Sequence, residues 1–237
     1  MKKLIALSIA TLSIFNTTSA FASTNNETTP IIYKDSQKIN LSDDTILELK
    51  TFLSESNVEE DIQDSLIKKI ERGEKLDCFN DDYLSQIPQN FFNISINEPV
   101  KRYTFPDGSF IEKGIIIPKD LKEISGGSGS SGTGFSSVKG AKVYIKQTVY
   151  SLGFFADYTF VQGGDDYISK VYDGYGKVIG GSMELPELSI KQKSENVSGP
   201  AEAEIKTQIN YVANTGYSET AWLKLHVGYD SAWTSNN

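Results

Sequence analysis

Apolar residues recur with the period of an α-helix over residues 41–73, and this pattern predicts two helices. The apolar positions of each helix share one face: Ile46, Leu49 and Leu53 in the first, and Ile62, Leu66 and Ile70 in the second. Ser42 and Asn57 are placed to cap the two helix starts, and Gly73 is placed to end the second helix. A third, short helix is expected to begin at Asp81.

Beyond residue 99 the spacing of apolar residues becomes that of β-strands. Residues 100–117 predict a β-hairpin, because Pro106, Asp107 and Gly108 form a turn sequence in its middle. Further strands are expected over residues 143–150, 152–161, 167–172, 201–211 and 222–229, with one or two more within 177–193, interrupted at Pro186. Turn signals lie at residues 163–164, 173–174 and 198–200.

The last two predicted strands each have one apolar and one polar face. The inward residues are Ala201, Ala203, Ile205, Ile209 and Tyr211 in the first, and Leu223, Leu225, Val227 and Tyr229 in the second. Trp222, Lys224 and His226 then face outward. This alternation indicates an antiparallel sheet with one buried and one solvated face.

These elements predict an α+β protein with a small N-terminal helical hairpin and β-hairpin, followed by an antiparallel β-sandwich or small barrel. The expected parts are a signal peptide (1–22), a flexible leader (23–40), an acidic helical region with the β-hairpin (41–125), a Gly/Ser linker (126–134) and an antiparallel β domain (135–237). Residues 40–82 hold 13 acidic and 5 basic residues, which we interpret as a solvated face.

The first 22 residues have the pattern of a secretory signal peptide. A basic start precedes an apolar run over residues 4–15, and residues 20–22 match a signal-peptidase site, so cleavage is expected between Ala22 and Ser23. The apolar run is too short for a bilayer span, which takes about 20 residues. We therefore expect a secreted, extracellular protein with no membrane span after signal removal.

Composition excludes several function classes. The chain has 237 residues and a net charge of -8, which disfavours binding to nucleic acid or to anionic membranes. A zinc site has too few ligands, because Cys78 and His226 are the only cysteine and histidine. We expect no metal or cofactor, and we interpret Cys78 as a small half-buried apolar residue, the alternative being a reactive or dimer-forming thiol.

Aromatic residues are concentrated in the predicted β domain, which holds 15 of the 26. Phe154, Phe155 and Phe160 are expected in its core. The aromatic residues expected to be exposed, and to form a binding surface, are Tyr144, Tyr150, Tyr172, Tyr175, Trp222 and Trp233. Exposed tyrosine and tryptophan side chains offer flat, amphipathic contact area that suits protein or glycan partners.

Carboxylates of the same region offer an enzymatic alternative. Asp157, Asp165, Asp166 and Asp173 lie among tyrosines, and paired carboxylates beside aromatic rings can hydrolyse a glycosidic bond. However, Asp165 and Asp166 follow two glycines, as in an ordinary hairpin turn, and no activating partner is visible. A non-enzymatic role is therefore the preferred interpretation.

The chain resembles a family of small, uncharacterised exported proteins of Gram-positive bacteria. The resemblance extends from about residue 45 to the C-terminal end of the sequence and is carried by residues 63–69, 72–74, 103–109, 156–164 and 198–201 and by Trp233. It implies a secreted protein with a helical acidic part and a C-terminal β-rich part. Members often have cysteines in the C-terminal part, which this chain lacks, and the family supplies no activity or site residues.

Together these features predict a secreted, non-enzymatic binding module that uses its β domain to bind a cell-wall or extracellular protein or glycan. One alternative is an antimicrobial or toxin-like protein, activated when the linker at residues 126–134 is cut. The other is the carboxylate-dependent glycan hydrolase.

Overall fold

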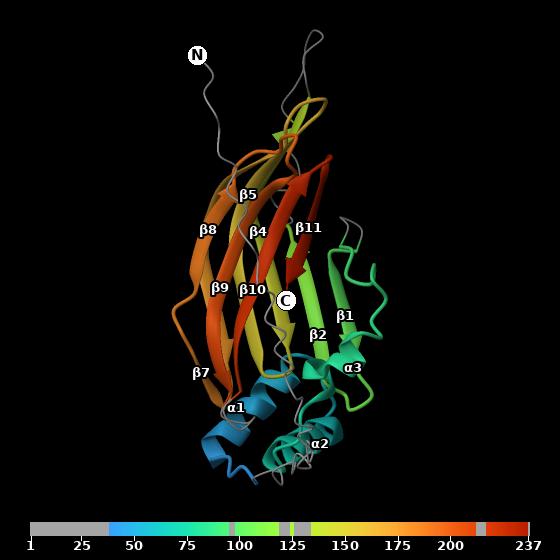
Figure 1. Ribbon diagram of the computed structural model, residues 1–237, viewed down its shortest axis with the longest axis vertical. Helices are drawn as coiled ribbons and strands as arrows, with labels where there is room; N and C mark the ends of the chain where they lie inside the picture. The colour runs from blue at the N-terminus through green and yellow to red at the C-terminus, as the bar shows by residue number, and fades with distance from the viewer. Residues whose placement is uncertain (1–37, 95–97, 119–123, 126–133, 212–216, 237) are drawn as a thin grey trace, which may run out of the picture. The chain divides into compact units, whose positions relative to one another are not determined.

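The structure is a computed structural model that describes residues 38–94, 98–118, 124–125, 134–211 and 217–236 (Figure 1). The predicted signal peptide, its cleavage site and most of the predicted leader and Gly/Ser linker lie outside these residues. The described residues form one compact unit. No helix in the described ranges is long and apolar enough to cross a membrane.

The helices lie together at one end of the two sheets (Figure 1). They are α1 (Asp43–Ser54), α2 (Glu60–Glu71), the one-turn helix η1 (Asp77–Phe79) and α3 (Asp81–Leu84). The Ser42 hydroxyl accepts a hydrogen bond from the Thr45 backbone N–H, as predicted for the cap of α1. Gly73 follows α2 with a φ of 69°, which confirms its predicted role at the helix end.

Asn57 does not cap α2, and the prediction for this residue was wrong. Its φ of 55° places it in the left-handed region, and its N–H donates to the Ser54 carbonyl. Asn57 therefore ends α1, a role that asparagine fills because it tolerates this conformation. Glu59 occupies the N-cap position of α2 without a side-chain hydrogen bond to the helix.

Two antiparallel sheets form the β part of the protein. The first sheet has the order β1-β2-β4-β5-β6, with β3 also paired to β4; the second has the order β11-β10-β9-β7, with β8 also paired to β9. The strands of the first sheet are β1 (Val100–Thr104), β2 (Phe110–Ile116), β3 (Ile124–Ser125), β4 (Phe135–Gln147), β5 (Tyr150–Val161) and β6 (Tyr167–Val178). Those of the second are β7 (Gly181–Met183), β8 (Glu187–Gln192), β9 (Ala201–Tyr211), β10 (Tyr217–Gly228) and β11 (Ser231–Asn236).

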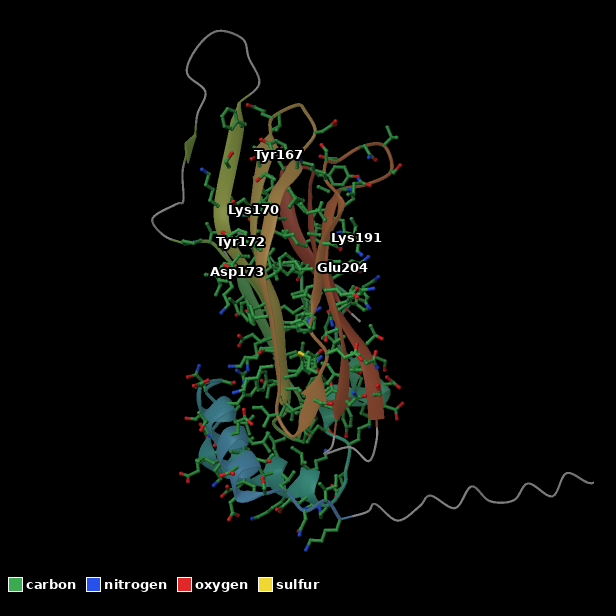
Figure 2. All side chains as sticks on the ribbon, turned by 90° about the vertical axis from the view of Figure 1, so that its left-hand side faces the viewer. Tyr167, Lys170, Tyr172, Asp173, Lys191 and Glu204 are labelled. Carbon is green, nitrogen blue, oxygen red and sulfur yellow. The ribbon has the colours of Figure 1, made fainter. Side chains whose placement is uncertain are left out.

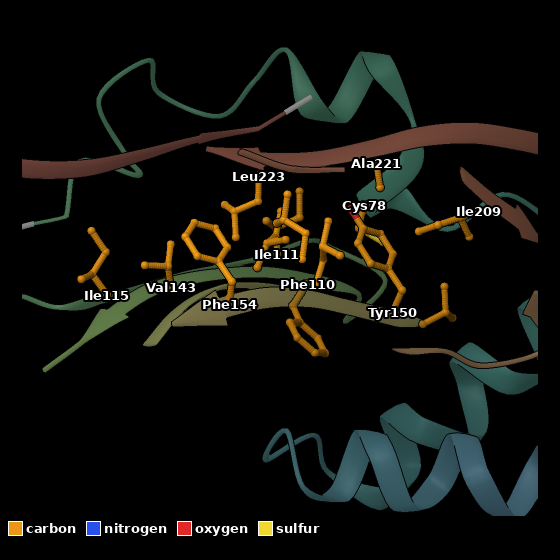
Figure 3. Close-up of a cluster of buried hydrophobic side chains, with 14 of the residues drawn as sticks. Cys78, Phe110, Ile111, Ile115, Val143, Tyr150, Phe154, Ile209, Ala221 and Leu223 are labelled. Carbon is orange, nitrogen blue, oxygen red and sulfur yellow. The ribbon is translucent and has the colours of Figure 1, made fainter. Parts of the chain in front are cut away.

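The sheets pack face to face around one core. This confirms the predicted α+β class and, of the two predicted architectures, the sandwich. Leu223 and Ala221 of β10 face Phe154 of β5 and Val143 of β4 across this core (Figure 3). Phe110 points from the opposite side of β2, toward the helices (Figure 3). The helices and the sandwich therefore share continuous apolar packing.

Three details of the sandwich differ from the sequence prediction. β6 does not end at Asp173 but continues to Val178, because Asp173 (φ 50°) lies in a bulge between the pairs Phe155–Tyr172 and Gly153–Tyr175. Phe155 is half-exposed on the outer face, since it follows the fully buried Phe154 in the same strand. Tyr229 is exposed because it lies in the turn after β10 and not on its inward face.

The β-hairpin of residues 100–116 belongs to the first sheet, although it was predicted to be part of the helical region. β2 pairs with β4 from Ile111 opposite Gln147 to Ile116 opposite Lys142. β3 and β4, which flank the glycine-rich segment, also pair, with Ser125 opposite Ser136. The segment between them therefore connects neighbouring strands of one sheet.

Candidate functional site

The six aromatic residues predicted to be exposed lie in three places. Tyr150 is part of the core and only 2% exposed, so its predicted exposure was wrong. Its ring packs against that of Tyr211, 6.4 Å away between centroids, because β5 begins there on the inner face. Tyr144, Tyr172 and Tyr175 lie on the outer face of the first sheet, whereas Trp222 and Trp233 lie on the outer face of the second.

The tyrosines of the first sheet form a continuous surface that we call the tyrosine–lysine face: Lys142, Tyr144, Phe155, Lys170, Tyr172 and Tyr175. β4, β5 and β6 place these residues side by side, with Lys142 opposite Phe155 and Phe155 opposite Tyr172. The rings of Phe155 and Tyr172 stack with centroids 5.9 Å apart and planes 19° apart. Phe155 was predicted in the core, although the alternation of side chains after Phe154 indicates that it lies on the outer face.

Two glycines allow the tyrosine rings of this face to lie flat against the sheet. Gly114 of β2 and Gly153 of β5 are both opposite Tyr144 of β4, and Gly153 is also opposite Tyr175 of β6. A Cβ at Gly114 would overlap the Tyr144 ring, and one at Gly153 would overlap the Tyr175 side chain. This close fit leaves Tyr144 only 9% exposed, so the predicted exposure was wrong for Tyr144 as well.

The lysines of the face are held by aromatic rings. The Lys142 ammonium lies 5.4 Å from the ring centroid of Tyr144 and 5.7 Å from that of Tyr175. The Lys170 ammonium lies 4.5 Å from the ring centroid of Tyr172. Neither lysine forms an ion pair with any residue in the described parts of the chain. The face therefore combines flat rings with cations that are available to an anionic ligand.

Figure 2 views the sandwich from the side and shows Lys170, Tyr172 and Asp173 on one sheet and Lys191 and Glu204 on the other. The two outer faces differ in charge pairing. On the second sheet, Lys191 pairs with Glu204 at 3.1 Å and Lys206 pairs with Glu187 at 3.1 Å. Their charges are thus satisfied within the sheet, unlike those of the tyrosine–lysine face.

Trp222 and Trp233 are half-exposed on the same outer face, with Trp222 opposite Lys206 and Trp233 opposite His226. Trp233 stacks on His226, with ring centroids 5.3 Å apart and planes 17° apart. His226 Nε2 also lies 2.7 Å from the Ser235 hydroxyl, and burial lowers the pKa of the imidazole. These contacts hold Trp233 and His226 in place on the outer face. Trp222, Lys224 and His226 of β10 were predicted to lie on this face.

Two of the carboxylates considered for hydrolysis, Asp157 and Asp166, accept hydrogen bonds from backbone N–H groups. Asp166 is 1% exposed, and its two oxygens accept hydrogen bonds from the backbone N–H groups of Val161 (2.7 Å) and Asp230 (2.8 Å). Asp157 accepts from the backbone N–H of Gly140 at 2.7 Å, whereas Asp165 is exposed. These bonds stabilise the turns and the bulge near them, which is a structural use of the carboxylates.

Cys78 is buried in a polar junction between the helices and the sandwich. Its backbone N–H donates to the Ser109 hydroxyl at 3.0 Å, and its thiol lies 3.5 Å from the Thr148 hydroxyl. Burial raises the pKa of the thiol to about 12, so the thiolate is not formed at neutral pH. The structure supports the interpretation of Cys78 as a small packing residue, buried more completely than predicted.

Comparisons with known proteins add little to this geometry. No family model and no curated protein matches the chain. Among solved structures, the chain is similar to a hypothetical protein from Listeria monocytogenes EGD-e, with 21% sequence identity and a TM-score of 0.32, over 58% of this chain and 92% of that one. This similarity is too low to show a family, so the resemblance to exported Gram-positive proteins stays a prediction.

Proposed function

We propose that the protein is an exported binding protein whose tyrosine–lysine face recognises an anionic glycan of the bacterial cell surface. The observation that carries the proposal is the pair of lysines, Lys142 and Lys170, seated on aromatic rings without a carboxylate partner among the described residues. Export rests on the signal-peptide pattern of residues 1–22.

The ring and charge arrangement favours a sugar polymer over an isolated anion. Stacked rings such as Phe155 and Tyr172 offer a flat apolar surface on which the C–H face of a sugar ring can lie. The neighbouring ammonium groups supply charge-assisted hydrogen bonds to carboxylate or phosphate substituents. Because the chain as a whole is acidic, with a net charge of -8, long-range attraction is absent and recognition depends on these local contacts.

The test is a sedimentation assay with the purified chain and isolated Gram-positive cell walls, before and after extraction of their anionic polymers. We expect retention on intact walls, weaker but measurable retention at high salt, and loss of retention after extraction. The double variant Lys170→Ala/Tyr172→Ala should bind about tenfold more weakly, because it removes one cation–ring pair and one stacking ring.

The matched control is Lys191→Ala/Trp222→Ala, which removes the same classes of side chain from the outer face of the second sheet. This variant should bind like the unmodified chain. Equal weakening of both variants, or undiminished binding to extracted walls, would overturn the proposal. A loss confined to the control variant would place the binding surface on the second sheet.

A further inference from the structure

A cleft lies between the two sheets. It is on the side where β11 approaches β2, and Figure 1 shows these two strands. Its volume is about 420 Å³, within the range of pockets that hold small ligands. The first sheet contributes Ile115, Val138, Tyr158 and Phe160 to its lining, and the second contributes Ala232. This cleft lies between the sheets and shares no residue with the tyrosine–lysine face.

The lining of the cleft is apolar inside and polar at its mouth. Ile115, Val138 and Tyr158 are buried, whereas Ser136, Asp230 and Ser231 are exposed. Asp230 is the one charged side chain among the described lining residues. A carboxylate at the entrance repels anionic amphiphiles, and an apolar interior disfavours any ion because of the loss of its hydration. The lining therefore selects an uncharged ligand.

Tyr158 carries a polar group among the apolar residues that line this cleft. The residue is only 2% exposed, and its hydroxyl makes no hydrogen bond to any residue that the structure describes. Burial alone raises the pKa of this phenol, with no contribution from a neighbouring charge or hydrogen bond. The hydroxyl oxygen is not among the fully buried, unpaired polar atoms, so it reaches accessible space, where it is a donor that a ligand can satisfy.

We propose that the cleft is a binding site for a small neutral apolar molecule that carries an acceptor oxygen, such as a carbonyl, for the Tyr158 hydroxyl. The apolar walls supply most of the affinity through burial of the ligand, and the hydroxyl selects for the acceptor. The site is independent of the glycan-binding proposal and stands if that proposal fails.

Fluorescent probes test the site directly. We expect saturable binding, with a rise in emission, of N-phenyl-1-naphthylamine, which is neutral, and of Prodan, a neutral naphthalene ketone. The anionic probe 1-anilinonaphthalene-8-sulfonate should bind more weakly than either. Asp230→Asn should reduce the difference in affinity between the anionic probe and the neutral probes. Asparagine tolerates the left-handed conformation found at this position (φ 54°).

Two variants localise the binding. Ala232→Phe places a ring in the cleft and should weaken both neutral probes by about tenfold or more. Its control is Ile116→Phe, which adds a ring on the exposed face of β2, next to the lining residue Ile115. Tyr158→Phe should weaken Prodan several-fold, in line with the roughly 1 kcal/mol of a net hydrogen bond, while leaving N-phenyl-1-naphthylamine unchanged. Circular dichroism checks that each variant is folded.

The proposal is overturned if neither neutral probe binds saturably to the folded chain. It is also overturned if Ala232→Phe binds both probes as the unmodified chain does, or if Ile116→Phe loses binding to the same degree. Equal loss of both probes in Tyr158→Phe would show that the hydroxyl does not select the acceptor oxygen.

Discussion

Lys113 is a buried cation on the inner face of β2. It is 7% exposed, forms no ion pair with a described residue, and has its ammonium 4.1 Å from the ring centroid of Phe92. Burial lowers its pKa from 10.5 to about 8. The unfolded chain therefore binds more protons than the folded chain between about pH 8 and 10.5, so this residue makes stability rise with pH over that window.

We expect Lys113→Met to raise the free energy of unfolding at pH 7 by about 2–3 kcal/mol, because it removes a buried charge and keeps the apolar stem. The variant should also lack the rise in stability that the parent shows between about pH 8 and 10.5. Urea unfolding at pH 7, 9 and 10.5 measures both effects, with Lys101→Met as the control on the opposing strand. A less stable Lys113→Met variant at pH 7 would mean that the contact with Phe92 outweighs the burial of the charge.

At the level of single residues, alternation along a strand predicted on which face of the sheet a side chain lies, but not how far that side chain is exposed to solvent. Trp222, Lys224 and His226 lie on the outward face as predicted, since a period of two fixes the side of the sheet. Tyr144 is also outward, but Gly114 and Gly153 let its ring pack flat and become covered. The burial of the Tyr144 ring depends on which residues of β2 and β5 lie opposite it. The register between strands cannot be inferred from the sequence of one strand.

At the level of elements, the turn around Asp107 joins the β-hairpin to α2. The Lys69 ammonium donates to Asp77 at 2.7 Å and to Asp107 at 2.8 Å, and Asp107 also accepts from the hydroxyl and N–H of Ser109. Burial alone would raise the pKa of Asp107, but the hydrogen bonds from Lys69 and Ser109 lower it below its usual value. Residues 106–108 predicted the turn, because proline and glycine set its backbone. Nothing local predicted its contact with a helix about 40 residues earlier in the sequence.

We expect Asp107→Asn to lower the free energy of unfolding by about 3 kcal/mol at pH 7, because Lys69 then keeps one carboxylate in a largely buried site. Thermal unfolding measures the loss. The contribution of Asp107 is present above its unfolded pKa near 4 and disappears as pH falls through the lowered folded value, so parent and variant should converge in acid. The control is Glu74→Gln, which breaks the exposed ion pair with Arg72 and should leave the midpoint of thermal unfolding unchanged. An equal loss in both variants would show that the junction is no stronger than a surface pair.

For the whole molecule, the sandwich could be predicted from the sequence, but which strands belong to each of its two sheets could not. The turn signals and alternation after residue 135 predicted antiparallel strands, and the change in composition at the glycine-rich segment suggested a separate domain there. Yet β1 and β2 come before that segment and pair with β4 after it. Pairing across such a segment depends on long-range contacts. A periodic pattern within one strand does not reveal these contacts.

This arrangement gives the glycine-rich segment a testable property. We expect that a chain cut within residues 126–133, at an inserted protease recognition sequence, keeps its two fragments together in native buffer. β2 and β3 would lie on one fragment and β4 on the other, and their pairing and shared core do not depend on the connection. Size-exclusion chromatography should show one peak for the cut chain, with two bands in denaturing electrophoresis, and the uncut insertion variant is the control. Separation of the fragments in native buffer would contradict this expectation and would restore the hypothesis of a toxin-like protein activated by cleavage. Co-elution would mean that cleavage alone releases nothing, because the acidic helices stay attached through β1 and β2 to the sheet that carries the tyrosine–lysine face.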